Sequence, residues 1–172
     1  MEYIQYKDIL SGREFHEQAE FLKQTEWRFV GISNPRSPNF WISKLNDNKF
    51  FTETLFERIK ELVKEDGFDV ELLKVYANGQ THGLSGDFHQ DHFDDTHWTF
   101  LVYFNHDWNA EWAGHTIIKS EEKQEFLSFL PIPNTGLFFR GDLWHVGMEP
   151  SRHCTELRTT VAYKLIVRGK ND

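Results

Sequence analysis

The stretch Gly67–Ala77, GFDVELLKVYA, divides the chain into two parts of different character. Before Gly67, apolar residues recur at helical spacing, and the glycine itself supplies a stop for the last helix. After it, short runs rich in β-branched and aromatic residues are separated by turn signals, with no useful helical period. Helices followed by many short strands predict an α+β, mainly β domain with a jelly-roll core.

Two helices are predicted before this point. Ser11–Gln24 opens with a serine and a glutamate in the spacing of a capping box, and Lys49–Glu65 carries the clearest helical periodicity. Between them, Trp27–Ile32 is predicted as a strand and the proline-containing Asn34–Pro38 as a loop. The strands predicted after Gly67 are Val70–Ala77, Phe88–Phe93, Trp98–Phe104, His115–Lys119, Leu137–Phe139, Trp144–Gly147 and Arg158–Val167.

Length and composition favour one globular domain over residues 1–172, with helical support in 1–67 and the jelly-roll core in 68–168. The net charge of −8 argues against nucleic-acid and anionic-membrane partners and leaves neutral small molecules and basic peptides open as substrates. The lone Cys154 excludes an internal disulfide. The N-terminus lacks signal-peptide character, and no apolar run approaches eighteen residues, so a cytoplasmic location is predicted.

Two H-x-D pairs occur in GDFHQDHFDD, residues 86–95. If Phe88–Phe93 is a strand, alternation places His89 and Asp91 on one face, close enough to share a metal. A third ligand must then come from another strand, for which His145 is the natural candidate. Two imidazoles and one carboxylate form the facial triad of non-haem Fe(II) oxygenases, which leaves positions open for a co-substrate and dioxygen.

The second pair, His92 and Asp94, would lie on the opposite face and cannot serve the same site. A solvated loop is the preferred interpretation of this pair. The same interpretation is preferred for four further histidines, which are His82, His97, His106 and His115.

Seven elements in a fixed order resemble one enzyme family. They are Tyr76-Ala77-Asn78-Gly79, His89-Gln90-Asp91, Leu101–Asn105 with Trp108, Ala113–Thr116, Pro133–Phe139, His145 and Arg158. Together they resemble the prolyl-4-hydroxylase-like branch of the 2-oxoglutarate/Fe(II) dioxygenases, over about half of the chain. The resemblance implies a double-stranded β-helix, a cupin-like jelly roll, with the N-terminal helices packed outside it.

The resemblance also implies a ligand set. Fe(II) would be held by His89, Asp91 and His145, and 2-oxoglutarate would chelate it, with dioxygen as the further co-substrate. The far carboxylate of 2-oxoglutarate would pair with Arg158, since a buried carboxylate needs a charge partner and guanidinium offers a bidentate one. Arg152, on a loop, is a competing partner that is harder to preorganise.

Three further residues belong to the implied co-substrate site. Tyr103 resembles the phenol that also contacts the far carboxylate, and Tyr76 resembles one that lines the pocket. Thr116 ends the turn that resembles the family's Gly-Gly-x-Thr. A core aromatic with a satisfied hydroxyl is an equally good interpretation of Tyr76.

The expected function is therefore an Fe(II)- and 2-oxoglutarate-dependent dioxygenase that hydroxylates a C–H bond and releases succinate and CO2. Its substrate could be a peptidyl proline, another peptide or an amino acid. The alternatives are a zinc-dependent hydrolase, which gives Arg158 no role, and a non-catalytic jelly-roll binding module. The segments Gln80–Asp87 and Trp108–Trp112 are expected to border the mouth of the site.

Overall fold

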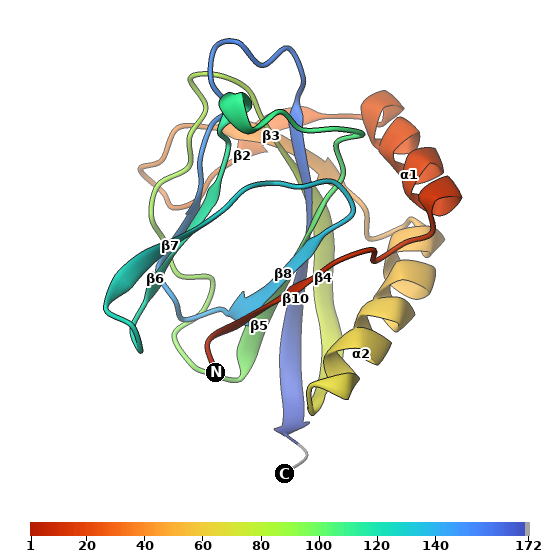
Figure 1. The fold of residues 1–172 in the computed structure, drawn as a ribbon, viewed down its shortest axis with the longest axis vertical. Helices are drawn as coiled ribbons and strands as arrows, with labels where there is room; N and C mark the ends of the chain where they lie inside the picture. The colour runs from red at the N-terminus through yellow and green to blue at the C-terminus, as the bar shows by residue number, and fades with distance from the viewer. Residues whose placement is uncertain (171–172) are drawn as a thin grey trace.

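A computed structural model describes residues 1–170, which fold into two facing β-sheets with helices outside them (Figure 1). The helical segments are α1 (Gly12–Gln24), the π-helical turn η1 (Phe50–Thr54), α2 (Leu55–Glu65) and the short 3-10 turn η2 (Ala110–Trp112). The strands are β1 (Tyr3–Tyr6), β2 (Arg28–Gly31), β3 (Phe40–Lys44), β4 (Phe68–Gln80), β5 (His97–Tyr103), β6 (Thr116–Ser120), β7 (Glu125–Phe129), β8 (Gly136–Arg140), β9 (His145–Gly147) and β10 (Arg158–Lys170).

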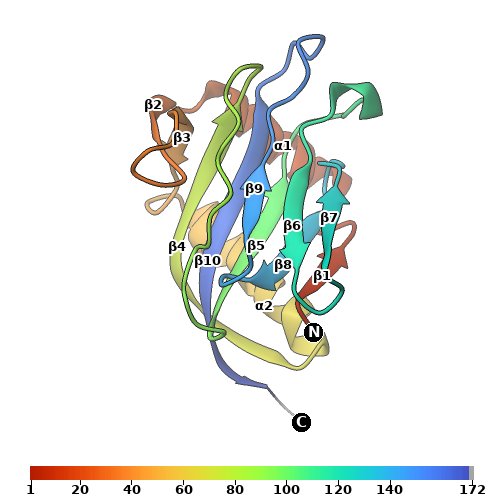
Figure 2. The same cartoon turned by 90° about the vertical axis from the view of Figure 1, so that its left-hand side faces the viewer.

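All strand pairs are antiparallel. The large sheet has the order β1-β8-β5-β10-β4-β3-β2, and the small sheet has the order β7-β6-β9. The small sheet lies in front of β5, β8 and β10 in Figure 2, whereas α1 and α2 cover the opposite face of the large sheet. The predicted α+β, mainly β class with N-terminal helices packed outside a jelly-roll core is confirmed.

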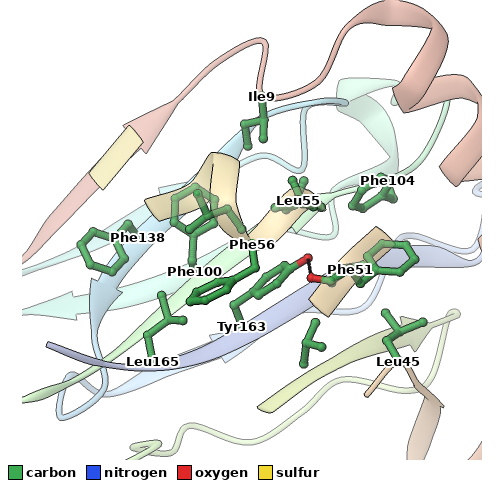
Figure 3. Close-up of a cluster of buried hydrophobic side chains, with 14 of the residues drawn as sticks. Ile9, Leu45, Phe51, Leu55, Phe56, Phe100, Phe104, Phe138, Tyr163 and Leu165 are labelled. Carbon is green, nitrogen blue, oxygen red and sulfur yellow. Dashed lines mark hydrogen bonds between the residues drawn. The ribbon is translucent and has the colours of Figure 1, made fainter. Parts of the chain in front are cut away.

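Strand β10 divides the interior by alternation, because successive side chains of a strand point to opposite faces. The side chains on one face are buried in the helix-covered core and are Val161, Tyr163 and Leu165. Figure 3 shows Tyr163 in this core, where its hydroxyl donates to the carbonyl oxygen of Phe51 at 2.9 Å. The side chains on the other face line a cavity and are Arg158, Thr160, Ala162 and Lys164.

Both predicted helices are present. At the start of α1, the Ser11 hydroxyl accepts from the N–H of Glu14, and the Glu14 carboxylate accepts from the N–H of Ser11, so the predicted capping box is confirmed. The second helix begins with the π-helical turn η1, which its periodicity did not reveal, and is followed by Gly67 at φ 86°. None of the helices formed by residues 1–170 combines the length and apolar character needed to cross a bilayer.

The predicted strand Phe88–Phe93 is wrong. Within it only His89 makes an isolated bridge, to His145. The N–H groups of Asp91 and His92 both donate to the carbonyl oxygen of Gly141, at 2.8 and 3.1 Å. Consecutive N–H groups of a strand point to opposite sides, so a shared acceptor requires a bend. The other predicted strands are present, whereas β1, β3 and β7 were not predicted.

Candidate metal centre

Three potential metal ligands converge between the two sheets. His89 Nε2 lies 3.7 Å from Asp91 Oδ1, and His145 Nε2 lies 3.4 Å from Asp91 Oδ2. One ligand atom from each of the three residues lies within 4.8 Å of the others. His145 is buried, whereas His89 and Asp91 are partly exposed toward the cavity. Two imidazoles and a carboxylate are a suitable donor set for a divalent transition metal.

Backbone hydrogen bonds, rather than strand alternation, produce this convergence. The N–H of His89 donates to the carbonyl of His145 at 3.0 Å, and the N–H of His145 donates back to His89 at 2.9 Å. The neighbouring bond from Asp91 to Gly141 fixes the next turn of the loop. The predicted grouping of His89, Asp91 and His145 is therefore present in space, but the geometric reason given for it is incorrect.

The tautomers of both histidines suit a metal ion. His89 Nδ1 lies 2.9 Å from the carbonyl oxygen of Asp87, and His145 Nδ1 lies 2.8 Å from that of Leu143. A carbonyl oxygen can only accept, so each Nδ1 carries the hydrogen, and each ring in its neutral form presents a bare Nε2 lone pair. Burial, with the neighbouring His145 ring, lowers the pKa of His89 and favours its neutral form. Backbone carbonyls behind ligating imidazoles are common at metal sites.

The Asp91 carboxylate is held by two donors. Its Oδ2 accepts from the Thr99 hydroxyl at 2.6 Å and from the Lys164 ammonium group. Burial acts to raise the pKa of Asp91, but Lys164 and His145 outweigh it and hold the pKa well below its ordinary value. The carboxylate is consequently ionised at neutral pH. Its Oδ1 remains turned toward His89.

Arg158 is a buried cation, 2% exposed, at the far end of the same cavity. Its hydrogen-bond acceptors are all neutral and consist of the Gly114 carbonyl, Gln80 Oε1 and the hydroxyls of Thr116 and Thr160. Within residues 1–170, no carboxylate forms an ion pair with it. Four of its five N–H donors are engaged, which leaves one on Nη2 for a further acceptor. A buried charge without a counter-ion is costly, so the site favours an anionic ligand.

Two of the three other residues expected at the co-substrate site, Tyr103 and Thr116, lie close to this cation. The Tyr103 ring stacks 5.7 Å from the Arg158 guanidinium, and its hydroxyl donates to Thr116 at 2.8 Å. Thr116 thus joins the phenol to the guanidinium. Tyr76 lines the cavity on β4. Burial raises the pKa of both phenols, so both are neutral at physiological pH.

The cavity has a volume of about 510 Å³, within the range of small-molecule sites. Gln80 and Gly86 line it, in agreement with a mouth bordered by the Gln80–Asp87 segment. The expectation for Trp108–Trp112 is wrong, because these residues are absent from the lining. Trp108 instead packs behind Arg158, where a Cβ added to Gly114 would lie 2.9 Å from its ring.

His92, Asp94 and His97 form a separate cluster beside the cavity mouth. The Asp94 carboxylate lies 2.9 Å from His92 Nδ1 and 2.8 Å from His97 Nδ1. The two rings are stacked with centroids 3.5 Å apart at 11°. Parallel rings at this separation cannot both direct a lone pair in plane at one ion, so the stacked arrangement argues against a second metal site.

Three of the four histidines expected in solvated loops are partly buried instead. His97 begins β5 and bonds Asp94, and His106 bonds Glu20 of α1 at 2.5 Å. His115 is also partly buried, and only His82 is mainly exposed. The loop residue Arg152 is exposed and does not line the cavity.

No family model and no curated protein matches the chain. Solved structures do. A prolyl hydroxylase from Trichoplax adhaerens, in complex with a hypoxia inducible factor peptide fragment, superposes with a TM-score of 0.75 at 16% identity, over 95% of this chain and 83% of that one. A 2OG-Fe(II) oxygenase family protein from Burkholderia pseudomallei gives 0.71 at 8% identity over 98% and 86%. HygX from Streptomyces hygroscopicus, with nickel and 2-oxoglutarate bound, gives 0.68 at 11% over 95% and 82%.

The chain has the double-stranded β-helix fold of the 2-oxoglutarate/Fe(II) oxygenases. In this oxygenase fold the candidate metal centre lies between the two sheets, and Arg158 begins the last strand.

Sequence analysis missed several residues of the site. Lys164 was not predicted as a site residue, although it shares the i, i+2 face of β10 with Arg158, a signal that was available. Lys74 and Gln80 also line the cavity from β4, and Thr99 lines it from β5. Gln80 and Thr99 gave no signal, because their roles depend on which strands become neighbours.

Proposed function

We propose that the protein is an Fe(II)- and 2-oxoglutarate-dependent dioxygenase that hydroxylates a C–H bond of a peptide or small molecule, with release of succinate and CO2. One observation carries the proposal. A cavity holds two bare Nε2 atoms and one carboxylate, and at its far end lies a buried guanidinium without a carboxylate partner. A metal and a dianionic co-substrate would satisfy both ends at once.

In this proposal His89, Asp91 and His145 hold Fe(II), and Arg158 binds the far carboxylate of 2-oxoglutarate with help from Thr116. When bound, the iron and the keto acid supply the oxidation by dioxygen that converts 2-oxoglutarate to succinate and CO2. The protein's own contribution is positional. The carbonyls behind each Nδ1 fix the imidazoles, and Thr99 with Lys164 fixes the carboxylate.

The cavity walls also exclude water. Leu101 and Ala162 line them between the two ends, and the buried Tyr103 ring lies 5.7 Å from the Arg158 guanidinium. A low-dielectric wall strengthens the charge pairing expected at the guanidinium. A zinc-dependent hydrolase is less well supported, because hydrolysis requires no buried cation at this position.

The proposal can be tested under nitrogen with metal-free protein reloaded with Fe(II). Addition of 2-oxoglutarate should produce a weak charge-transfer absorption in the visible, and admission of air should release succinate. Protein loaded with zinc is the matched control and should do neither. Full turnover by the zinc-loaded protein, or a failure of 2-oxoglutarate to bind any metal-loaded form, would contradict the proposal.

A further inference from the structure

The cavity is positively charged, although the chain carries a net charge of −8. Three fixed cations line it, namely Arg158, Lys164 and Lys74. Among the described residues that line it, Asp91 is the only carboxylate. A cavity of opposite sign to the rest of an acidic protein concentrates anions locally, because its low-dielectric walls focus the field.

Binding of the metal and the co-substrate of the proposed function does not neutralise this positive charge. Fe(II) and 2-oxoglutarate carry equal and opposite formal charges, so binding both leaves the balance of the cavity unchanged. Arg158 would face the far carboxylate of the co-substrate. Lys164 and Lys74 then remain at the other end, opposed only by the Asp91 carboxylate, which the metal would share.

The two lysines lie side by side. Lys164 of β10 pairs in register with Lys74 of β4, and residues directly opposite each other share one face of a sheet. Like charges at such positions destabilise a sheet unless an anion lies between them. Lys74 is exposed at the rim, its Nζ lies 5.4 Å above the Tyr76 ring, and residues 1–170 give it no ion pair.

Lys164 is 13% exposed and also hydrogen-bonds the Tyr76 side chain, so it offers a further anion its charge rather than a spare donor. Its ammonium contacts Asp91 and the Thr99 hydroxyl, at 3.1 Å for the latter, and an ammonium group carries three donors. Asp94 lies beside His92 and His97 of the cavity lining. Its carboxylate is already bonded to Thr96 and His97 and lies beside His92, so it does not neutralise the lysines.

We propose that the substrate carries a carboxylate, which Lys164 and Lys74 bind at the end of the cavity opposite Arg158. The inference rests on the proposed function and names the substrate class of the same site. Residues 158 and 164 lie six positions apart on one strand, about 20 Å at ~3.3 Å per residue, so two anions can occupy the two ends together. A free acid and an acidic side chain of a peptide would present the same group.

The test uses Ni²⁺-loaded protein saturated with 2-oxoglutarate and measures the binding of matched acid and amide probes by calorimetry. The small-molecule pairs are benzoate with benzamide, and N-acetyl-glutamate α-amide with N-acetyl-glutamine α-amide. The peptide pair consists of two blocked pentapeptides that differ by one Glu or Gln. We expect the acid of at least one pair to bind about tenfold or more tightly than its amide. The pair that responds distinguishes a free acid from a peptide.

Lysine variants assign the preference to this end of the cavity. Lys74 forms no ion pair with a carboxylate of residues 1–170, so Lys74→Met removes only its charge from the cavity. This variant should reduce the preference for the acid over the amide to about threefold or less. Lys164→Met should do the same, whereas Lys164→Arg keeps the charge and should keep the preference. Lys44→Met is the matched control, because Lys44 is an exposed residue of β3 outside the cavity and its loss changes the net charge equally.

Two results would overturn the inference. One is an equal or weaker affinity for the acid in every pair, including no binding by any probe. The other is a preference that survives both Lys74→Met and Lys164→Met. The proposed function is tested separately: if it is wrong, 2-oxoglutarate will not bind the Ni²⁺-loaded protein. In that case the same pairs are titrated into metal-free Arg158→Met protein, where neither a bound metal nor Arg158 can attract the acid and a preference for it is assigned to the lysine end.

Discussion

The backbones of His89 and His145 are hydrogen-bonded to each other in both directions, at 3.0 and 2.9 Å. These two bonds join a loop to the start of β9 without the participation of either side chain. The loop consequently keeps its position when an imidazole is removed, so substitution at either residue tests ligation separately from folding.

His89→Ala and His145→Ala should each weaken Ni²⁺ binding by at least about 100-fold, since each removes one of three donors. The melting temperature of the metal-free protein should change far less, because the backbone bonds remain. Titration with Ni²⁺ and differential scanning calorimetry provide the two measurements. His92→Ala is the control and should bind the metal as the wild type does. If His92→Ala loses the metal while His89→Ala retains it, the ligand assignment is wrong.

Arg158→Ala should weaken 2-oxoglutarate binding by about thirtyfold to several thousandfold, because a desolvated charge pair is worth roughly 2–5 kcal/mol. Arg158→Lys should have an intermediate affinity, since it keeps the positive charge but loses the bidentate hydrogen-bonding geometry of the guanidinium. Calorimetric titration into Ni²⁺-loaded protein measures both, and metal affinity itself should hardly change. The exposed Arg152→Ala is the matched control. If Arg158→Ala bound 2-oxoglutarate with wild-type affinity, another residue would have to bind its far carboxylate.

Ala113→Gly should stabilise the protein by about 1 kcal/mol. Ala113 precedes β6 at φ 54° and ψ −121°, a conformation that a Cβ disfavours and glycine adopts freely. Relief of strain worth roughly 1–3 kcal/mol exceeds the 0.5–1 kcal/mol entropic cost of a glycine. Urea denaturation gives the free energy of unfolding. A lower stability for Ala113→Gly would show that the Ala113 methyl group contributes packing that outweighs the strain.

The next residue should respond with the opposite sign. Gly114 has φ 69°, and a Cβ there would lie 2.9 Å from the Trp108 ring and 3.2 Å from Arg158 Cδ. Gly114→Ala should therefore both lower stability and displace the guanidinium. The expected readout is weaker 2-oxoglutarate binding in a protein that still binds Ni²⁺ normally. An unchanged affinity for 2-oxoglutarate would show that the added methyl group displaces the Trp108 ring and not the Arg158 side chain.

Glu2→Gln should destabilise the protein at pH 7 and cease to do so in acid. Glu2 is buried, its carboxylate accepts from Ser120 Oγ at 2.5 Å, and two backbone N–H groups of the β6–β7 turn donate to it. Burial acts to raise its pKa, but these hydrogen bonds outweigh burial and lower it. A depressed folded-state pKa contributes stability above the unfolded value, near 4.5, and loses it as pH falls through the folded value.

The expected cost of Glu2→Gln is about 1.5–3 kcal/mol at pH 7, the usual worth of hydrogen bonds to a charged group. It should shrink as pH falls from about 5 toward 3, where the protonated carboxyl resembles the amide. Urea unfolding of both proteins across this range measures the difference. A cost that is constant with pH would assign the effect to shape rather than to charge.

Local signals predicted the parts of the fold that depend on local chemistry. Both helices follow from periodicity and from the Ser11 cap, and the fold class follows from the change at Gly67. Strands β1 and β7 lie at sheet edges and contain few or no buried side chains. Such strands form because they hydrogen-bond to the free backbone groups of a neighbouring strand. A short window of sequence contains no information about that neighbour.

Sequence analysis named the residues of the candidate site but did not predict how the backbone holds them together. The alternation of FHQDHF resembles a strand, yet the segment is held as a loop by Gly141 and His145, which lie about fifty positions away. Arg158 was placed correctly on the inward face of its strand, because alternation and burial are properties of β10 itself. Two of the polar side chains around it, Gln80 and Thr116, belong to β4 and β6, so only the assembled sheets bring them to the guanidinium.

The alternation of β10 has a consequence for how the protein's ligand preference could diversify. Even-numbered positions from 158 to 164 face the cavity, and the odd-numbered ones between them face the core. One inserted or deleted residue in this span would exchange the two sets and move cations into the apolar interior. The length of this span therefore cannot vary, whereas Thr160 and Ala162 can be replaced without disturbing the helix-covered core. Ala162 is buried in the apolar cluster between the two sheets, so only small side chains suit that position. Redesign of ligand preference should begin with libraries at these two positions and leave Val161 and Tyr163 untouched.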